Sequence, residues 1–270
     1  MLLTDIDSNI VYFSEWLKDF TCYDTIIEKL TKHQIKYALL PHTRDYWVRD
    51  FMPIQISDSE FIQYKYNPNY LQKEQYYITN PDRAYNHLGI STKKIDIVLD
   101  GGNVVKCSDC IIMTDKIFRE NNHLSKIQAI NMMENSFRCE IIFIPWDRYE
   151  KYGHVDGMVR FIDDRKILLN NYINFDKSLR SQIINVLQNK FEIIELEYGV
   201  PKPSSYSWAY INYLEVGKFI LLPALGIPED EQAYEQFSTI FSDYQIEQVN
   251  VAEIIKLGGA LNCISWNIKY

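Results

Sequence analysis

The chain has 270 residues, of which 47% are hydrophobic and 24% are charged, and its formal net charge is −8. This length and composition are ordinary for a globular protein that buries a sizeable core. The acidic balance and the lack of a long basic run argue against a nucleic-acid partner, and no stretch approaches the roughly 20 apolar residues of a membrane-spanning helix.

The predicted elements alternate between helices and short strands. The first thirty residues predict an amphipathic helix whose apolar stripe consists of Trp16, Leu17, Phe20, Ile27 and Leu30. Further helices are predicted at 125–135, 177–189 and 229–241. Short apolar runs predict buried strands at 35–40, 95–99, 110–113, 140–144, 167–169, 191–194 and 219–222. This alternation indicates an α/β fold.

Two pairs of strands have the spacing of hairpins. Residues 104–113 turn at Ser108 and Asp109, and residues 158–169 turn at Asp163 and Asp164. Hairpins with intervening helices favour a repeated ββαβ unit over a doubly wound parallel sheet. The polar, Tyr-rich segment 65–86 predicts a long excursion of the kind that often carries specificity. No linker composition divides the chain, so we expect one domain over residues 1–270.

The first two candidate motifs each have an ordinary structural interpretation. Trp47 precedes Arg49 and Asp50, which could form a structural ion pair at the start of a strand. Asp100 stands before two glycines, and Asp-Gly is a favoured turn dipeptide. Adjacent glycines also permit close backbone approach to a ligand, which would leave Asp100 at the end of a strand facing a cleft.

The third motif, Gly-His-Val-Asp, contains His154 and Asp156. If the segment is a strand, both side chains project from the same face, because side chains alternate with a period of two. A histidine and a carboxylate aimed at one space form an acid/base and cation-binding pair. A single histidine is otherwise more often a satisfied core residue.

The fourth motif places Cys263 after the turn Gly258-Gly259. A free cysteine is usually a small buried hydrophobe, but a glycine-rich turn presents a side chain at the mouth of a cleft. A single cysteine with a distant histidine is a candidate nucleophile pair. The pair Cys107 and Cys110 has the spacing of half a zinc site, but no second such pair exists in the sequence, so we expect no metal.

The cysteines give no disulfide framework, because they are five, an odd number, and are scattered along the chain. Acidic residues also stand near the first methionine, where a signal peptide would carry basic ones. We therefore expect a cytoplasmic protein.

The four motifs together supply what hydrolysis of a guanidinium group requires. A planar cation is held best by carboxylates that accept its N–H groups in pairs. Its carbon is a poor electrophile and calls for a strong nucleophile such as a thiolate, and a neighbouring acid/base must protonate the departing ammonia and then activate water. The chain offers such a set in the order Asp50, Asp100, His154, Asp156, Cys263.

These motifs resemble those of the guanidino-group-modifying superfamily, in the branch of agmatine deiminases and Porphyromonas-type peptidylarginine deiminases. The resemblance rests on Trp-Val-Arg-Asp-Phe-Met-Pro, Asp-Gly-Gly, Gly-His-Val-Asp with Arg-Phe, and the Gly-Gly turn before Cys263. It includes Tyr-Ile-Asn-Tyr around Asn212 and Pro-Ala-Leu-Gly at 223–226. The matches span residues 45–266 in order, and five in order are specific although each alone is weak.

The resemblance implies an α/β-propeller of five ββαβ units around a pseudo-fivefold axis. It implies that Asp50 and Asp156 clamp the guanidinium, that His154 is general acid and then general base, and that Cys263 forms a covalent thiouronium intermediate. Trp47 and Asn212 are expected near the substrate. The family position that orients the histidine is commonly Glu, and here it is Asp100, whose side chain is about one bond shorter.

The expected substrate is a small cationic guanidino compound, agmatine first and free or peptide-borne arginine next, with no cofactor and with a homodimer as a possible assembly. Two alternatives stay open. The same residues could transfer the amidino group to an amine, and the fold could serve a non-catalytic propeller that binds a partner.

Overall fold

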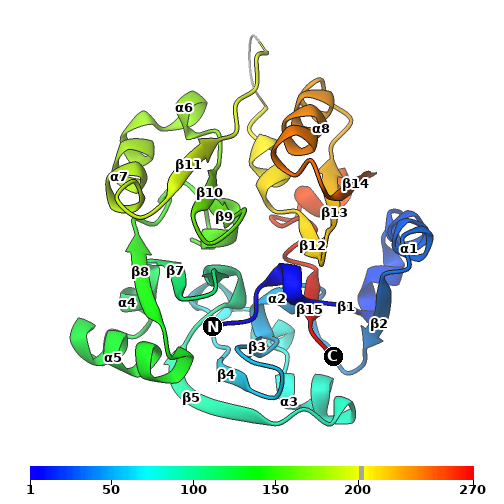
Figure 1. Ribbon diagram of the computed structural model, residues 1–270. Coiled ribbons are helices and arrows are strands. Elements are labelled where there is room, and N and C mark those ends of the chain that lie inside the picture. Colours follow the sequence, from blue (N-terminus) through cyan, green and yellow to red (C-terminus); the bar gives the residue numbers. More distant parts are fainter. Residues whose placement is uncertain (201–203) are drawn as a thin grey trace.

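The computed structural model describes residues 1–200 and 204–270, and it contains five three-stranded sheets arranged in a ring (Figure 1). Most of the longer helices lie on the outside of this ring (Figure 1). The α/β fold and the five-unit propeller predicted from the family resemblance are therefore confirmed.

Each sheet follows one plan: a strand pairs antiparallel with the middle strand, and the middle strand pairs parallel with the third. The parallel pair needs a crossover, which a helical segment supplies. In ring order the sheets are β15 (Ser265–Ile268), β1 (Ile10–Ser14) and β2 (Lys36–Leu40); β3 (Ile54–Gln55), β4 (Phe61–Lys65) and β5 (Thr92–Val98); β6 (Val105–Lys106), β7 (Cys110–Thr114) and β8 (Glu140–Ile144); β9 (Val159–Phe161), β10 (Lys166–Leu169) and β11 (Glu192–Glu195); and β12 (Leu214–Val216), β13 (Phe219–Ala224) and β14 (Gln245–Asn250).

The described α-helices are α1 (Tyr23–Lys32), α2 (Val48–Phe51), α3 (Pro81–Tyr85), α4 (Lys116–Glu120), α5 (Lys126–Phe137), α6 (Tyr172–Phe175), α7 (Lys177–Leu187), α8 (Glu229–Ile240) and α9 (Ala252–Ile255). Their ends have recognisable causes. Ser125 and Gln128 form a capping box at the start of α5, and the Asp176 side chain accepts from the Leu179 amide at the start of α7. Among the described helices, none has the length and apolar character needed to cross a bilayer.

The ring is closed by its two ends, because the last strand β15 pairs with the first strand β1. The prediction of a single helix over the first thirty residues is wrong, because part of this segment is a strand. Residues 10–14 form β1, whose middle residues are buried from both faces, and the helix α1 begins only at Tyr23. A strand buried on both faces reads as a continuous apolar run, which periodicity alone does not separate from a helix.

The other predicted strands and helices are found within a few residues of their expected bounds, and both predicted hairpins are present as β6–β7 and β9–β10. The strands β3, β4, β12, β14 and β15 have no counterpart among the predicted strands. The excursion at 65–86 contains two short 3-10 helices, η3 (Asn69–Leu71) and η4 (Gln75–Tyr77), and leads into α3.

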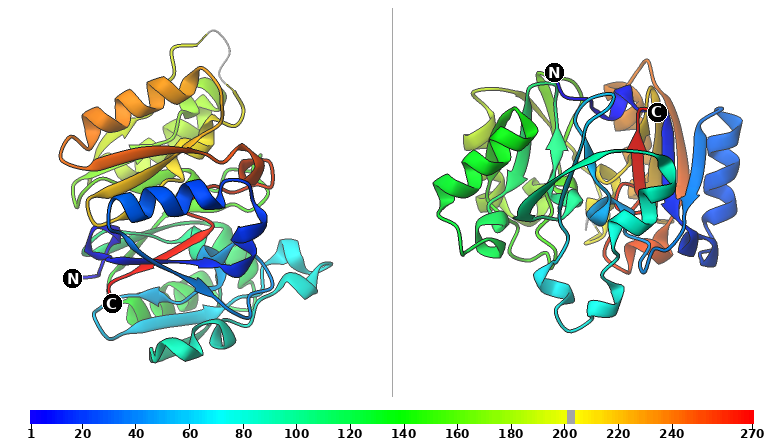
Figure 2. Two further views of the ribbon diagram at one scale, coloured as in Figure 1. Left: turned by 90° about the vertical axis from the view of Figure 1, so that its right-hand side faces the viewer. Right: turned by 90° about the horizontal axis from the view of Figure 1, so that it is seen from below.

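Apolar side chains form several clusters between neighbouring sheets and the helices outside them. On α1, for example, Ile26 and Leu30 are one turn apart and are fully buried. The two termini lie on one face of the ring, and the excursion that contains η3 and η4 projects on the opposite face (Figure 2).

Candidate active site

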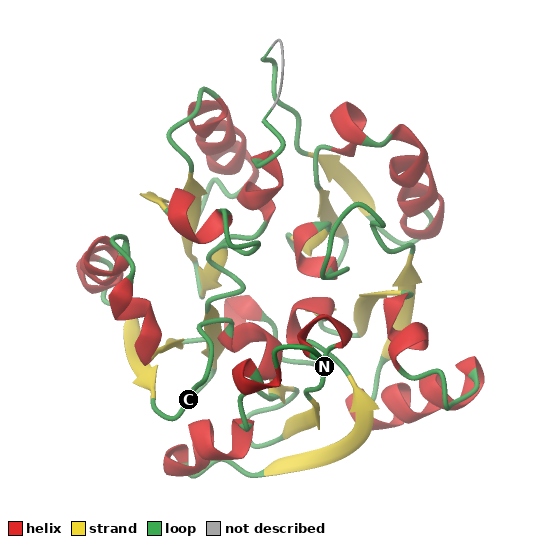
Figure 3. Cartoon of the chain, turned by 180° about the vertical axis from the view of Figure 1, so that it is seen from behind, coloured by secondary structure: helices red, strands yellow, loops and turns green. Residues whose placement is uncertain are grey.

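Five segments join each sheet to the next, and short helices on several of them lie towards the middle of the ring (Figure 3). Three of them carry short 3-10 helices, namely η6 (Gly101–Asn103), η7 (Val155–Gly157) and η8 (Ser207–Ile211). The helix η7 contacts both η6 and η8, and η6 also contacts α2. Each joining segment supplies at least one predicted site residue: Trp47 and Asp50, then Asp100, then His154 and Asp156, then Asn212, and finally Cys263.

Asp50 is buried on α2 and faces the imidazole of His154. Its Oδ1 atom accepts a hydrogen bond from the Gly102 amide at 3.1 Å and lies 3.6 Å from His154 Nδ1. A Cβ at Gly102 would lie 2.6 Å from His154 Nδ1 and 2.8 Å from Asp50 Oδ1, so only glycine allows this approach. Burial raises the pKa of Asp50 to about 7, and the nearby Asp100 and Asp156 add to the rise while His154 opposes it.

Asp100 holds the other nitrogen of the same ring. His154 Nε2 lies 3.0 Å from Asp100 Oδ2, so the aspartate reaches the histidine despite its short side chain. Burial favours the neutral carboxyl, but the His154 hydrogen bond and the Lys116 ammonium hold the pKa of Asp100 below its usual value. The imidazole is thus held between two carboxylates.

His154 responds to this environment by holding its proton. Burial alone would disfavour the charged ring, but the charge of Asp50 and the hydrogen bond to Asp100 outweigh it and raise the pKa of His154 to about 9. At neutral pH the ring is therefore an imidazolium, ready to donate a proton.

The predicted strand around His154 and Asp156 is wrong. His154 has extended backbone but caps η7, and Asp156 lies within this 3-10 helix. The strand β9 begins only at Val159. Both side chains nevertheless line the same pocket, because the tight turn of η7 directs them there in place of a strand's alternation.

Cys263 lies beside Asp156 and is held by its own segment. Its Sγ atom is 3.7 Å from Asp156 Oδ2, and the same oxygen accepts a hydrogen bond of 2.6 Å from Asn262 Nδ2. Asn212 fixes the backbone, because its Oδ1 accepts from the Cys263 amide at 3.2 Å and its carbonyl accepts from the Asn262 amide at 3.0 Å. Asn212 therefore positions the cysteine segment.

The surroundings of Cys263 favour the protonated form of its thiol. Burial raises its pKa well above the usual range, and the charges of Asp156 and Asp50 raise it further. A cation placed between those two carboxylates would cancel their effect and favour the thiolate.

Two cavities open onto Cys263 and His154. One, of about 470 Å³, is also lined by Asp156, and the other, of about 200 Å³, by Asp50 and Trp47. The Trp47 ring packs against the glycine turn before the cysteine, since a Cβ at Gly259 would lie 2.2 Å from it. The two carboxylates thus approach the thiol and imidazole from different cavities.

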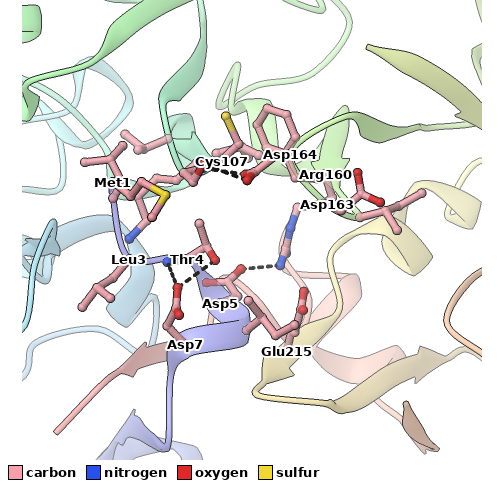
Figure 4. Close-up of a pocket in the computed structure, with 18 of the residues that line it drawn as sticks. Met1, Leu3, Thr4, Asp5, Asp7, Cys107, Arg160, Asp163, Asp164 and Glu215 are labelled. Carbon is pink, nitrogen blue, oxygen red and sulfur yellow. Dashed lines mark hydrogen bonds and ion pairs between the residues drawn. The ribbon is translucent and has the colours of Figure 1, made fainter. Parts of the chain in front are cut away.

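A third cavity, of about 420 Å³, contains none of Cys263, His154 or Asp156 (Figure 4). It is lined in part by residues of the N-terminal segment, where Arg160 donates to Asp5 at 2.7 Å and the Thr4 hydroxyl donates to Asp7 (Figure 4). We assign it a structural role at the end of the ring where the termini lie.

Cys107 and Cys110 face each other at the turn of the β6–β7 hairpin, where with Asp109 they bring three donor atoms within 4.8 Å. The cluster lies outside the site just described. Within the described residues it offers three ligands and no fourth, which is short of a closed structural zinc site.

Known proteins resemble this chain in sequence and in structure. The family model of the Porphyromonas-type peptidyl-arginine deiminases matches residues 14–268. The chain belongs to this family. A putative agmatine deiminase of Legionella pneumophila is 26% identical over 274 residues, which cover 88% of this chain and 76% of the relative.

Solved structures of deiminases share the fold of this family member. An agmatine deiminase of C. jejuni with substrate bound has a TM-score of 0.80 at 16% identity, covering 100% of this chain and 96% of that one. A putative arginine deiminase from Porphyromonas gingivalis has a TM-score of 0.78 at 16% identity, covering 99% and 97%. The predicted family and fold are thereby confirmed.

Three residues of the site were not predicted from the sequence of this deiminase-family chain. Asn262 stands next to the cysteine and could have been found by its position alone. Tyr70 and Tyr152 pack edge to face at 4.9 Å and lie near the His154 ring. Tyr70 belongs to the Tyr-rich excursion, whose abundance of tyrosines gave no reason to choose one.

Proposed function

We propose that this chain hydrolyses a guanidino substrate to a ureido product and ammonia, with Cys263 as the nucleophile. The observation that carries the proposal is the convergence of one thiol, one imidazole and three carboxylates from four separate joining segments. In a merely structural cluster the buried carboxylates would be paired with fixed cations, whereas Asp156 faces a thiol and lines an open cavity.

In this mechanism Asp50 and Asp156 accept the N–H groups of the guanidinium. Paired carboxylates match the planar, forked geometry of this cation, and the low dielectric of a buried site strengthens the contact. Bound between them, the substrate carbon would lie next to Cys263 Sγ, which is 3.7 Å from Asp156.

Substrate binding also activates the nucleophile. The cation offsets the two carboxylates that, after burial, keep the thiol protonated. The thiolate then attacks the guanidinium carbon, and the departing nitrogen takes a proton from His154 and leaves as ammonia. The result is a thiouronium joined to Cys263.

Water completes the cycle. His154, now neutral, takes a proton from water as it attacks the thiouronium carbon, and the carbon–sulfur bond breaks to release the ureido product and the thiolate. Asp100 keeps the imidazole oriented through both steps by its contact with Nε2 at 3.0 Å. The Cys263 proton goes to solvent when the substrate binds and returns when the product leaves. The hydroxyl proton of the collapsing adduct converts the released ammonia to ammonium, so the net reaction is guanidinium plus water giving the ureido product and ammonium.

Agmatine is the first candidate substrate. Among the described residues that line the two cavities at Cys263, the carboxylates are Asp45, Asp50, Glu74, Asp147, Glu150 and Asp156, and the lysines are Lys151 and Lys256. This acidic excess suits a substrate with a second cationic end better than one with a carboxylate. The name of the Legionella relative points in the same direction.

A parallel screen tests the proposal: ammonia release from agmatine, free arginine and arginyl peptides by the pure protein, with Cys263→Ala as the matched blank. Turnover of at least one substrate by the wild type alone supports the proposal. No release from any of them by the wild type would overturn it. Candidate amines added to the same assay show whether an amidino group is transferred instead.

The cytoplasmic location stays a prediction. The homodimer also stays a prediction, because the structure contains a single chain. Sedimentation of the pure protein at several concentrations tests the second of them.

A further inference from the structure

Lys116 is a buried charge that the proposed mechanism does not use. It opens α4, directly after the strand β7, and 1% of its side chain is exposed. Lysine is almost never fully buried unless it is paired, because removing an ammonium from water is costly. Its partners therefore indicate why it is there.

The ammonium of Lys116 joins two buried carboxylates. Its Nζ atom lies 3.1 Å from Asp100 Oδ2 and 3.1 Å from Glu120 Oε1, and it sits 5.1 Å from the centre of the Tyr70 ring. Asp100 Oδ2 is also the oxygen that meets His154 Nε2 at 3.0 Å. One carboxylate oxygen thus connects the lysine to the imidazole.

The second oxygen of that carboxylate has no such anchor. Asp100 Oδ1 is buried and has no hydrogen-bond partner among the described residues. The rotation of the Asp100 carboxylate is therefore set by the two contacts to Oδ2, and one of these is to the histidine that must change its protonation state during the reaction. The lysine contact is the one that stays constant.

We propose that Lys116 is a positioning residue, which holds the Asp100 carboxylate ionised and turned towards His154 Nε2. The inference rests on the proposed function for its catalytic consequence, and on the contacts alone for its structural part.

The charges around the imidazole make this role necessary. Asp50 on α2, Asp100 before η6 and Lys116 on α4 act on His154, and Tyr70 and Tyr152 lie against its ring. Glu120 places a further carboxylate behind Lys116. Without the lysine, Asp100 would face Glu120 and Asp50 with only His154 to balance them, which disfavours its charged form.

The stem of Lys116 has a second contact with the same segment. Gly153, which precedes His154, has a φ of +68°, and a Cβ there would lie 2.8 Å from Lys116 Cδ. The methylene chain therefore packs against the backbone that presents the histidine, in the manner of a long cationic side chain whose stem covers apolar surface. The ammonium and the stem support the same residue.

Nuclear magnetic resonance on ¹⁵N-histidine-labelled protein tests the structural part without any turnover. The hydrogen-bonded Nε2 proton of His154, assigned by its loss in His154→Gln, should give a downfield signal in the wild type. We expect Lys116→Met to move this signal upfield or abolish it, Lys116→Arg to preserve it, and the surface variant Lys190→Met to leave it unchanged. Lys190 is a matched control, because it is also a lysine paired with a carboxylate, that of Glu140, but it lies at the surface.

Steady-state kinetics test the catalytic part. Lys116 touches no substrate in the proposed mechanism, so Lys116→Met should lower kcat at least about tenfold while KM stays within about threefold. Lys116→Arg should recover most of the loss. In an Asp100→Asn background, Lys116→Met should lower kcat little further, because the two residues act as one unit.

Lys116→Met leaves Glu120 buried without its cation and could fail to fold. The double variant Lys116→Met/Glu120→Gln removes both charges and keeps the test decisive. A folded double variant with the wild-type Nε2 signal and wild-type kcat would overturn the inference. Should the wild type turn over no guanidino compound, the proposed function fails, while the resonance still decides the Lys116–Asp100–His154 contact.

Discussion

Cys263 and His154 both hold their protons more tightly than usual, for different reasons. Burial and two carboxylates keep the thiol neutral, whereas carboxylates on both ring nitrogens keep the imidazole charged. The pair is therefore a thiol beside an imidazolium, and in the proposed mechanism a cationic substrate that offsets Asp50 and Asp156 favours the thiolate. Discrimination in favour of cations follows from this arrangement.

Asp156→Asn separates the effect of this carboxylate on the pKa of Cys263 from its proposed effect on substrate binding. Removing its charge lowers the thiol pKa, so alkylation of Cys263 by iodoacetamide at pH 7 should accelerate by about fivefold or more. Turnover should fall by at least about a hundredfold, because the substrate loses one of its two carboxylates. The surface variant Asp243→Asn should change neither rate, and slower alkylation in Asp156→Asn would contradict the account.

His154 makes stability depend on pH in a defined window. Its folded-state pKa of about 9 exceeds the ordinary 6.5, so the folded protein binds this proton more tightly than the unfolded chain. The resulting stabilisation is complete below pH 6.5 and is lost as the pH rises to 9, with a slope of at most about 1.4 kcal/mol per pH unit.

Urea unfolding of the wild type and of His154→Gln between pH 6 and pH 10 measures this contribution. The free energies of unfolding of the two proteins should converge as the pH rises through the window, and a difference that is independent of pH would argue against a charged imidazole.

The sequence pointed to the candidate site residues through their order along the chain, since each motif alone was weak. It did not reveal Lys116. A lysine at the start of a short helix is ordinarily exposed, and its burial depends on contacts with Asp100 and Tyr70 that are distant in sequence. Such residues are found only when the fold brings their partners together.

At the scale of elements, predictions succeeded for the longer helices and for short apolar runs such as the fully buried β7, and failed at β1, β14 and η7. The helices α5, α7 and α8 carry clear caps or periodicity and were predicted closely. The strand β1 is buried on both sides and was taken for part of a helix. The short helix η7 was taken for a strand, because three residues are too few for any period to appear.

The substitution Gly102→Ala tests how closely η6 must approach the side chains of His154 and Asp50. In Gly102→Ala the new Cβ would lie 2.6 Å from His154 Nδ1 and 2.8 Å from Asp50 Oδ1, so both side chains must move. We expect kcat to fall at least about a hundredfold, since displacements of about 1 Å at a reacting group cost that much.

Gly199→Ala is the matched control for this substitution, because its nearest neighbour would be a side-chain oxygen 3.8 Å away. Both variants should give the circular dichroism spectrum of the wild type. Equal activity of Gly102→Ala and Gly199→Ala would contradict the need for this close approach.

At the scale of the whole molecule, the ring is held shut where its last strand meets its first. Asn267 on β15 donates to Asp5 Oδ1, to Ser8 Oγ and to the Glu215 carbonyl, and accepts from Arg49. These partners come from three sheets or their connections. The single domain expected over residues 1–270 stays a prediction, and ring closure supports it because no unit can then unfold alone.

Asn267→Ala should lower the free energy of unfolding by about 1–3 kcal/mol, because it leaves buried polar groups of several units without partners. Urea unfolding followed by far-UV circular dichroism and by tryptophan fluorescence measures the loss, and the two probes should give coincident transitions. Asn9→Ala, at an exposed asparagine bonded to Tyr270, should change stability by less than about 0.5 kcal/mol. Two separate transitions in the wild type would contradict a single domain.

The most direct measurement of the central claim is mass spectrometry of the protein after acid quench of its reaction with the substrate found in the screen. We expect a transient adduct, equal to the substrate less ammonia, on the peptide that contains Cys263, in the wild type and in the control variant Cys139→Ala. Cys263→Ala should show neither adduct nor ammonia release. Continued ammonia release by Cys263→Ala, or an adduct on another residue of the wild type, would contradict the assignment of Cys263 as the nucleophile.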